Sequence, residues 1–354
     1  MKKTSLKNSE IKVKKLGVIL APTKNRFENR AVLNPGVFQD KDYVHIFYRA
    51  VDKRNNSSIG YAKLKGPTKV IERWEKPIIR REYPYERKGC EDPRIVKIGG
   101  LFYLTYVAHD GKNAVTAYAV SRDLKKFDKK GVITPRLTYD YVGRLFRKEK
   151  LKDRYFMFES FYEEYAGKDV YLWEKDVILF PKKIKGQFAM LHRILPDVQI
   201  VNFKSFKQIG NNRFWVKYLK HLSKHVVMEN KYWFESRNIG GGAPPVETKK
   251  YWLLIYHAVE EINKNRTYHA AAALVKKSDP AKYVARLHYP LFSPEEKYEK
   301  KGLVANVVFP TGTAIFGKDL YIYYGAADKH IAVAKVNLNG LIKEILKKAR
   351  IHMN

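Results

Sequence analysis

The stretch DYVHIFYRAVDKRNNSSIGYAKL, residues 42–64, shows the unit from which this chain is built. Tyr43, His45 and Phe47 recur at every second position, which is the period of a β-strand and not of a helix. This aromatic-rich strand ends in a charged residue, Arg49, and a second strand with small residues follows after a polar turn. We therefore expect a β-hairpin that belongs to a larger sheet.

The same unit recurs four more times. The further copies are GLFYLTYVAHDGKNAVTAYAVSRDL (100–124), GQFAMLHRILPDVQIVNFKSF (186–206), KYWLLIYHAVEEINKNRTYHAAAALV (250–275) and KDLYIYYGAADKHIAVAKVNL (318–338). Hairpins repeated between turn-rich segments indicate radial repetition, so the sequence predicts an all-β fold, a five-bladed β-propeller with a short C-terminal helix. A β-sandwich with coincidental hairpins is the alternative.

Each copy has a polar residue at the end of its first strand. If these strands line a central channel, their polar ends converge near one mouth of it, and such a cavity is the default candidate for an active site. The residues in question are Arg49, His109, Arg193, His257 and Asp328.

We expect a single catalytic domain over residues 1–354. Residues 139–171 fall outside the repeat and lengthen the connection between its second and third copies, as an added hairpin or a lid. Near the C-terminus, Leu341, Ile342, Ile345 and Leu346 have helical spacing, which predicts a short helix that packs against one end of the propeller.

Charge is the most unusual bulk property of the chain, with a formal net charge of +33 over 354 residues. The lysines are spread along the whole sequence, and no zinc-finger or RNP motif occurs, so we interpret the charge as a general surface property and consider nucleic acid an unlikely partner. The one cysteine, Cys90, excludes an intramolecular disulfide. The N-terminal apolar run LGVILA is too short for a signal peptide or a membrane span. We expect a cytoplasmic protein without membrane association.

A set of motifs resembles glycoside hydrolase family 130, the mannoside phosphorylases and mannosidases. Each motif alone is weak, but their joint order and spacing, from about Asn34 to Asp328, are specific. The motifs are LNPG from Leu33, YRAVD from Tyr48, GCEDPR from Gly89, KDVILFPKKIKGQFAMLHR from Lys175, GGGAPP from Gly240, WLLIYHAV from Trp252, PLFSPEEKYEKKG from Pro290, NVVFPTG from Asn306 and YYGAAD from Tyr323. The resemblance also implies a five-bladed propeller.

Asp92 in GCEDPR is, by this resemblance, the catalytic general acid. Cleavage of a glycoside requires a proton on the leaving oxygen, and in the phosphorylases of the family it is thought to pass through a hydroxyl of the bound mannose. Glu91 and Arg94 would orient Asp92 or hold its loop. On the fragment alone, a charged surface turn would be the simpler interpretation.

The resemblance also assigns two binding sets. The phosphate-binding positions are Lys175, Arg193, His257 and Tyr268, and the sugar-binding positions are Asn34, Arg49 and Asp328. One departure is notable, because many of these phosphorylases have a lysine just before the glycine run where this chain has Asn238. The neighbouring Arg237 would replace that lysine if it turns inward. Tyr83, Tyr85 or Tyr103 are candidates for stacking on the acceptor sugar.

The sequence therefore predicts a reversible, inverting phosphorylase that converts β-1,2- or β-1,4-manno-oligosaccharides and inorganic phosphate to α-mannose 1-phosphate, without a cofactor or metal. Phosphate is already an anionic nucleophile, so no second catalytic carboxylate is required. The first alternative is a β-mannoside hydrolase on the same scaffold, with Glu235, Glu159 or Glu163 activating water. A basic, non-catalytic propeller that binds nucleic acid or acidic glycans is less favoured, and the oligomeric state, with a homo-oligomer among the alternatives, stays open.

Overall fold

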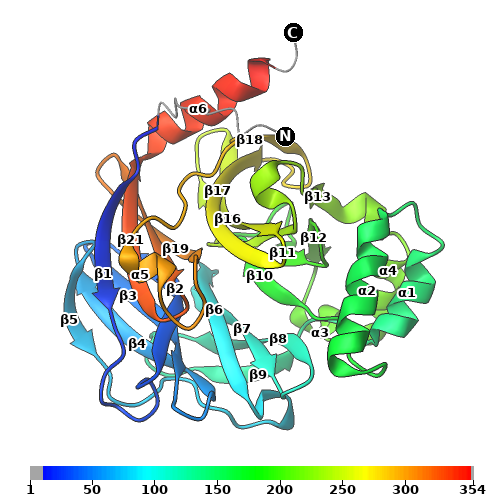
Figure 1. Ribbon diagram of the computed structural model, residues 1–354, viewed down its shortest axis with the longest axis horizontal. Coiled ribbons are helices and arrows are strands. Elements are labelled where there is room, and N and C mark those ends of the chain that lie inside the picture. The colour runs from blue at the N-terminus through cyan, green and yellow to red at the C-terminus, as the bar shows by residue number, and fades with distance from the viewer. Residues whose placement is uncertain (1–10, 352–354) are drawn as a thin grey trace.

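The computed structural model describes residues 11–351, and their strands form four sheets (Figure 1). The eight-stranded sheet consists of two antiparallel groups joined by one parallel pairing, so the strands form five antiparallel groups in all. The first group contains β2 (Ala31–Asp40), β3 (Tyr43–Val51), β4 (Ser57–Lys65) and β5 (Lys69–Arg73), and the second contains β6 (Gly89–Ile98), β7 (Leu101–His109), β8 (Ala114–Ser121) and β9 (Asp128–Val132). The third contains β10 (Lys175–Leu179), β11 (Phe188–Arg193), β12 (Val198–Phe203) and β13 (Val226–Met228). The fourth contains β14 (Asn238–Gly241), β15 (Val246–Glu247), β16 (Tyr251–Ile262), β17 (Asn265–Lys276) and β18 (Tyr283–Arg286).

The fifth group joins the two ends of the chain. It contains β19 (Val308–Phe316), β20 (Asp319–Ala326) and β21 (His330–Asn337), and β1 (Lys14–Leu20) adds to β21 as its outermost strand. In Figure 1 the blue β1 accordingly lies beside the orange-red β21. The first and second groups are linked by a single parallel pairing, Ser57 with Gly89, and the first strands β19, β2, β6, β10 and β14 contact one another in that order.

All five expected hairpins are present, as β3–β4, β7–β8, β11–β12, β16–β17 and β20–β21. Strands account for 47% and helices for 17% of the chain, which confirms the all-β class. The repeat recognised in the sequence starts one strand too late, however, because every group has a further strand that precedes its hairpin.

A buried glutamate recurs in the chain before the first strand of every group. Each of the five has a fully buried side chain and is bonded to a ring on the second strand of its group, a tyrosine hydroxyl in four groups and an imidazole in the third. The pairs are Glu28–Tyr48 at 2.6 Å, Glu86–Tyr106 at 2.6 Å, Glu174–His192 at 3.1 Å, Glu235–Tyr256 at 2.7 Å and Glu299–Tyr324 at 2.7 Å.

In four groups, a cation of the outermost strand completes this network. The four cations, which lie 2.7–3.2 Å from the glutamates, are Arg73 of β5, Lys129 of β9, Arg286 of β18 and Lys15 of β1. The third group departs from this pattern, because its histidine, His192, is bonded at 2.8 Å to Tyr218 of a helix instead. Buried carboxylates need such partners, and these networks fix the strands of each group to one another.

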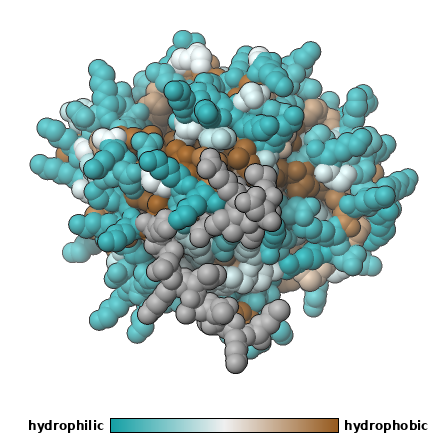
Figure 2. Space-filling model, turned by 90° about the horizontal axis from the view of Figure 1, so that it is seen from above, coloured by the Kyte–Doolittle hydropathy of each residue, from teal (hydrophilic) through white to brown (hydrophobic). Residues whose placement is uncertain are grey.

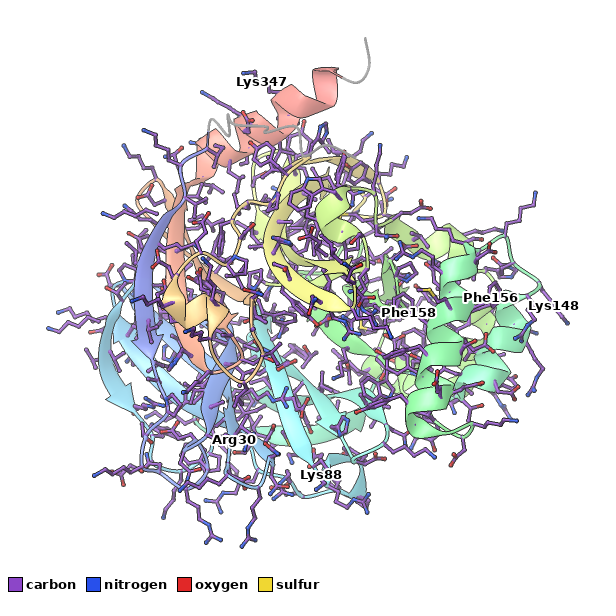
Figure 3. The ribbon with its side chains drawn as sticks, in the orientation of Figure 1. Arg30, Lys88, Lys148, Phe156, Phe158 and Lys347 are labelled. Atoms are coloured by element: carbon purple, nitrogen blue, oxygen red, sulfur yellow. The ribbon has the colours of Figure 1, made fainter. Side chains whose placement is uncertain are left out.

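The segment 139–171 is helical, so the expected hairpin is wrong. It forms α1 (Tyr139–Phe146) and α2 (Asp153–Ala166), and two further α-helices, α3 (Phe206–Ile209) and α4 (Asn212–Leu219), lie between β12 and β13. The Thr138 side chain accepts a hydrogen bond from the backbone N–H of Tyr141 and thereby caps α1. Phe158 lies on the side of α2 that faces the sheets, whereas Phe156 lies on the opposite side (Figure 3). The helices thus cover the third group.

The C-terminal helix α6 (Leu338–Ile351) confirms the expected helix. Leu341 and Ile345 are fully buried among side chains of the fourth and fifth groups, and Ile342 and Leu346 pack at the edge of the same cluster. Hydrophilic side chains dominate the face shown in Figure 2. The remaining helices are short, namely η1 (Pro84–Glu86), η2 (Leu222–His225), η3 (Trp233–Glu235) and α5 (Lys297–Lys300). Within residues 11–351, no helix has the length and apolarity that a membrane span requires.

Candidate active site

A cavity of about 450 Å³ receives residues from all five groups and from α2. It brings together the predicted general acid, all the predicted sugar-binding residues and all the predicted phosphate-binding residues except His257. Its polar and charged lining consists of Asn34, Arg49, Asp92, Lys175, Asp176, Arg193, Arg237, Asn238, Arg266, Tyr268 and Asp328. The predicted convergence of polar strand ends holds for Arg49, Arg193 and Asp328, whereas His109 and His257 do not line this cavity.

The same backbone irregularity places three of these side chains. In β2, β6 and β10 the strand register shifts at the cavity, and the residues there, Asn34, Asp92 and Asp176, have φ values of 49°, 49° and 59°. Asparagine and aspartate tolerate this left-handed conformation better than other residues that have a side chain. A bulge of this kind changes the direction of a side chain relative to the regular strand. All three residues line the cavity.

The glycine of LNPG has a steric role at this point. A Cβ atom on Gly36 would lie 2.7 Å from the carbonyl oxygen of Pro93, which is closer than real Cβ atoms come to backbone oxygen. The two bulges of β2 and β6 therefore touch, and only glycine permits that approach.

Asp92 is held by neighbours on the first group. The Asn34 Nδ2 donates a hydrogen bond of 2.8 Å to Asp92 Oδ1, and Arg49 Nη1 lies 3.7 Å from the same oxygen. Arg49 bonds more closely to Glu91 Oε1, at 2.7 Å. Burial opposes ionisation of Glu91, but Arg49 and Lys175 outweigh it and lower the pKa of this carboxyl. Arg94 donates to the backbone carbonyl of Asp92 at 2.9 Å, so it holds the loop and not the Asp92 carboxylate.

Asp328 is a second carboxylate of the cavity, and its environment is less favourable for charge. Burial, together with the nearby charges of Asp92 and Glu91, raises its pKa to about 6, although Arg49 and Lys175 act in the opposite direction. Its φ of 51° is again left-handed. A carboxyl group of this kind accepts or donates hydrogen bonds, which suits the recognition of sugar hydroxyls.

Asp176 is a third carboxylate, which the sequence analysis did not single out. Its Oδ2 lies 2.8 Å from Arg193 Nη1 and 3.8 Å from His257 Nε2, and its Oδ1 lies 3.8 Å from Arg94 Nη2. Burial would raise the pKa of Asp176, but Arg193, His257 and Arg94 lower it overall. Asp176 therefore stays ionised and fixes the Arg193 guanidinium at the cavity wall.

His257 lies behind the cavity wall. Its ring is fully buried, and burial lowers its pKa to about 4, so the imidazole is neutral near pH 7. A Cβ atom on Gly240 would lie 2.4 Å from this ring and 2.9 Å from Asp176, which explains the glycine of GGGAPP. His257 therefore does not reach the cavity itself but lies against Asp176, which does.

The cations of the cavity differ in how far they are neutralised. Within the described residues, no ion pair joins the Lys175 ammonium to a carboxylate, and it lies 4.8 Å from the centre of the Trp173 ring. Arg237 does turn inward: it lines the cavity, lies over the rings of Phe158 and Phe161, and bonds to Glu261 at 2.7 Å. The cavity therefore retains positive charge.

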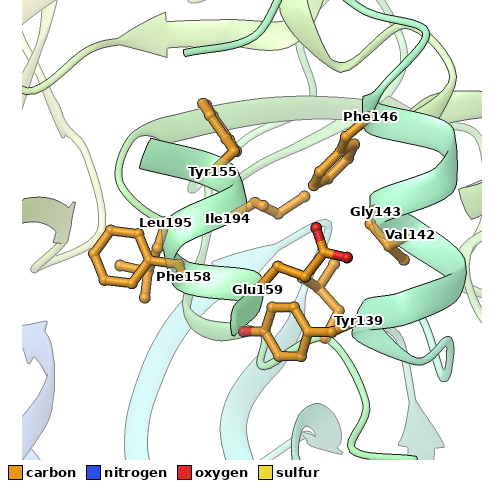
Figure 4. Close-up of a pocket in the computed structure, with 10 residues that line it drawn as sticks. Tyr139, Val142, Gly143, Phe146, Tyr155, Phe158, Glu159, Ile194 and Leu195 are labelled. Carbon is orange, nitrogen blue, oxygen red and sulfur yellow. The ribbon is translucent and has the colours of Figure 1, made fainter. Parts of the chain in front are cut away.

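The acids suspected for hydrolysis lie elsewhere in the described structure. Glu235 belongs to the buried network of the fourth group, and Glu163 does not line the cavity. Glu159 points into a separate space of about 10 Å³ between α1 and α2, beside Gly143, and its Oε1 lies 3.2 Å from Arg147 Nη2 (Figure 4).

The aromatic lining also differs from expectation. Tyr83 and Tyr85 stack on each other away from the cavity, and Tyr103 stacks on Phe206. The cavity instead receives aromatic side chains of α2 and of the segment that follows it. These are Phe161, Tyr162, Tyr165 and Trp173. In the sequence, the aromatic-rich stretch FMFESFYEEY of residues 156–165 is the signal for these cavity-lining rings. Its position relative to the cavity, however, depends on the fold.

Comparison with known proteins gives a consistent picture. A family model described as beta-1,4-mannooligosaccharide phosphorylase matches residues 6–348. The chain belongs to glycoside hydrolase family 130. It is 31% identical to a 1,2-beta-oligomannan phosphorylase of Thermoanaerobacter sp. (strain X514), over 94% of this chain and 99% of that protein. A Beta-1,2-mannobiose phosphorylase of the same organism is also 31% identical, over 90% of this chain and 94% of that protein.

The fold of this family 130 member is likewise similar to solved structures. The complex of the Beta-1,2-Mannobiose phosphorylase from Listeria innocua with beta-1,2-mannobiose superimposes with a TM-score of 0.71 at 20% identity, covering 94% of this chain and 99% of that one. Family membership identifies the chain as an enzyme that acts on β-mannosides.

Proposed function

We propose that this enzyme catalyses the reversible, inverting phosphorolysis of β-1,2-linked manno-oligosaccharides to α-mannose 1-phosphate. The observation that carries the proposal is the pairing, in one cavity, of the positioned Asp92 with cations that lack full neutralisation by carboxylates. Phosphate binding needs such cations, whereas hydrolysis needs a carboxylate that activates water. The β-1,2 linkage follows the two Thermoanaerobacter relatives, and β-1,4 linkage is the alternative.

The reaction divides between two sides of the mannose ring. A phosphate oxygen forms a bond to C1 while the bond from C1 to the glycosidic oxygen breaks, and the leaving oxygen takes a proton that originates from the Asp92 carboxyl group. The transition state is oxocarbenium-like, and attack from the opposite face inverts C1. The Asn34 amide and the Arg49 guanidinium stabilise the Asp92 carboxylate that remains. The reverse reaction extends a manno-oligosaccharide from mannose 1-phosphate.

In this proposal, phosphate is bound by Lys175, Arg193, Arg237 and Tyr268. Guanidinium groups suit phosphate because their N–H donors match two of its oxygens at once. His257 contributes indirectly, because it lies against Asp176, which fixes Arg193. No metal and no organic cofactor takes part.

The transferred mannose is bound by Asn34, Arg49 and Asp328. The next sugar of the chain stacks on the aromatic wall of Phe161, Tyr165 and Trp173. The segment 139–171 supplies Phe161 and Tyr165, and Trp173 lies just after it. In this proposal the helical segment 139–171 is a fixed wall of the sugar-binding site and not a lid that opens and closes.

We also propose that the five strand groups are the blades of one five-bladed β-propeller with the cavity at its axis. Support comes from the buried glutamate that recurs before the first strand of every group, from the sequential contacts of the first strands, and from the closure of the last group by β1. Removal of β1 tests this proposal: a closed ring predicts loss of cooperative unfolding, whereas an open array would lose only local stability.

The test of activity is incubation with β-1,2-mannobiose in the presence and absence of phosphate. Phosphate-dependent formation of mannose 1-phosphate, with the α-anomer seen by NMR, is the expected result. Release of free mannose that is independent of phosphate would establish the hydrolase instead. Tight binding of RNA without turnover of any mannoside would support the non-catalytic basic protein.

A further inference from the structure

Two adjacent strands of the fourth group carry a row of side chains along the cavity wall. Residues two apart on a strand share a face, so His257, Val259 and Glu261 of β16 form one column. The register pairs Val259 with Tyr268 and Glu261 with Arg266, which places Tyr268 and Arg266 of β17 beside them. Both Tyr268 and Arg266 line the cavity. Arg266 is therefore the outer neighbour of Tyr268.

A single carboxylate holds two arginines at this position. Glu261 Oε2 accepts a hydrogen bond of 2.7 Å from Arg237 Nη1 and one of 2.8 Å from Arg266 Nε. One negative charge thus faces two positive charges, so one positive charge is left over. The Arg266 side chain is 39% exposed, compared with 12% for Arg237. Arg266 is therefore the more solvent-accessible of the two arginines.

Three arginines surround two phenol groups at the same wall. Burial raises the pKa of both Tyr162 and Tyr268, and Arg193, Arg237 and Arg266 each act in the opposite direction on both hydroxyls. The two tyrosines and the three arginines all line the same cavity, so their phenol and guanidinium groups share one space. Tyr162 comes from α2, which means that the helical segment closes this space.

We propose that Arg266 is a phosphate-binding residue of this enzyme and that Glu261 positions both Arg266 and Arg237 for that purpose. The two arginines take over the role of the lysine whose place Asn238 occupies. The paired arginines supply forked donors, where a lysine would supply a point charge. This inference rests on the proposed phosphorolysis and adds residues to it.

The first experiment compares Arg266→Gln and Arg266→Lys with Arg213→Gln as a matched control. Arg213 is an exposed arginine of α4 that does not line the cavity, so its loss removes the same charge from the protein. We expect Arg266→Gln to raise the KM for phosphate about tenfold or more while the KM for β-1,2-mannobiose stays within about twofold. Arg266→Lys should fall in between, and Arg213→Gln should match the wild type.

The second experiment measures the KM for phosphate of Glu261→Gln. The KM should change in opposite directions depending on whether Glu261 positions the two arginines or only reduces the positive charge of the cavity. If Glu261 positions the arginines, its loss raises the KM for phosphate even though the cavity becomes more positive. If it only reduces the charge, its loss lowers that KM. A lowered KM would therefore overturn the positioning role.

The outcomes separate this inference from the proposed function. Wild-type enzyme that forms no mannose 1-phosphate contradicts the phosphorylase. Phosphorolysis with an unchanged KM for phosphate in Arg266→Gln, or with an equal rise in the KM for mannobiose, contradicts the role of Arg266. Thermal unfolding of each variant shows whether it is folded, and Arg266→Lys, which keeps the charge, supplies the test if Arg266→Gln does not fold.

Discussion

The five glutamates of the strand groups and the aspartates of the cavity are the same kind of chemical group in very different surroundings. Glu235, for example, accepts hydrogen bonds from two backbone N–H groups and from Tyr256, and Arg286 lies 3.2 Å away. Asp92 accepts one hydrogen bond from Asn34, and no hydrogen bond from another described residue reaches the Asp328 carboxyl group. A buried carboxylate with a full set of partners stabilises the fold, whereas one with unmet capacity is available to a ligand.

The third group adds a variation to this comparison. Its network uses Glu174, His192 and Tyr218, where the other groups use a tyrosine and a cation of the outermost strand. Its outermost strand, β13, has only three residues, and helices take the place of a longer one. The connection that leads into this group contains α2, whose aromatic side chains line the cavity. The site thus gains its aromatic wall next to the group in which the regular scaffold is altered.

The largest effect is expected for Asp92→Asn. The amide has the size of the carboxyl group but donates no acidic proton, so kcat should fall about 10²- to 10⁴-fold with little change in thermal stability. Steady-state rates and calorimetry on the same preparation measure both quantities. A variant that keeps full activity would remove Asp92 from the mechanism.

Glu235→Gln should show the reverse pattern. Loss of the buried charge leaves Arg286 without its partner, and we expect the free energy of unfolding to fall by about 3 kcal/mol while the folded enzyme keeps its kcat. Urea unfolding provides the measurement, and Tyr256→Phe, which removes one hydrogen bond, should cost only about 1 kcal/mol. Lost activity at unchanged stability would make Glu235 a catalytic base and favour hydrolysis.

Asp328→Asn should alter the pH dependence of stability. The folded protein holds this carboxyl at a pKa of about 6, against an ordinary value of 3.8. Between those pH values the unfolded chain releases the proton and the folded protein keeps it, so stability falls as pH rises through this window and is level above it. The amide does not titrate, so the free energy of unfolding of the variant should increase relative to that of the wild type as the pH rises from 4 to 7. The total increase should be up to about 3 kcal/mol. Parallel stability curves for the two proteins would contradict the raised pKa.

The smallest effect is expected for Asp140→Asn on α1. Asp140 and Arg144 form an ion pair one helical turn apart, with side chains 52% and 61% exposed, so its loss should change the free energy of unfolding by less than about 0.5 kcal/mol. Chemical denaturation measures the free energy of unfolding of Asp140→Asn, which is then compared with that of Glu235→Gln. A loss as large as that of Glu235→Gln would show that burial does not govern the difference between the two carboxylates.

The five buried glutamates also share a short pattern in the sequence. An aromatic residue precedes glutamate in Phe27–Glu28, Tyr85–Glu86, Trp173–Glu174, Phe234–Glu235 and Tyr298–Glu299. The dipeptide is short and common, so its meaning emerges only when the ring partner of each glutamate is known. The hairpin repeat was visible because alternation over many residues is a strong local signal.

Local periodicity and motifs read along the chain were sufficient for the strand content, the five hairpins and the family, and eight of the nine residues predicted for the site line the cavity, where their roles stay predictions. The tertiary structure decided which charges are neutralised. Asp176 pairs with Arg193, Glu261 pairs with two arginines, His257 lies behind the wall, and the α2 aromatics enter the cavity. Such pairings join residues that are distant in the chain, and the electrostatic interaction of two side chains depends on their separation in space and their burial, which no local pattern encodes.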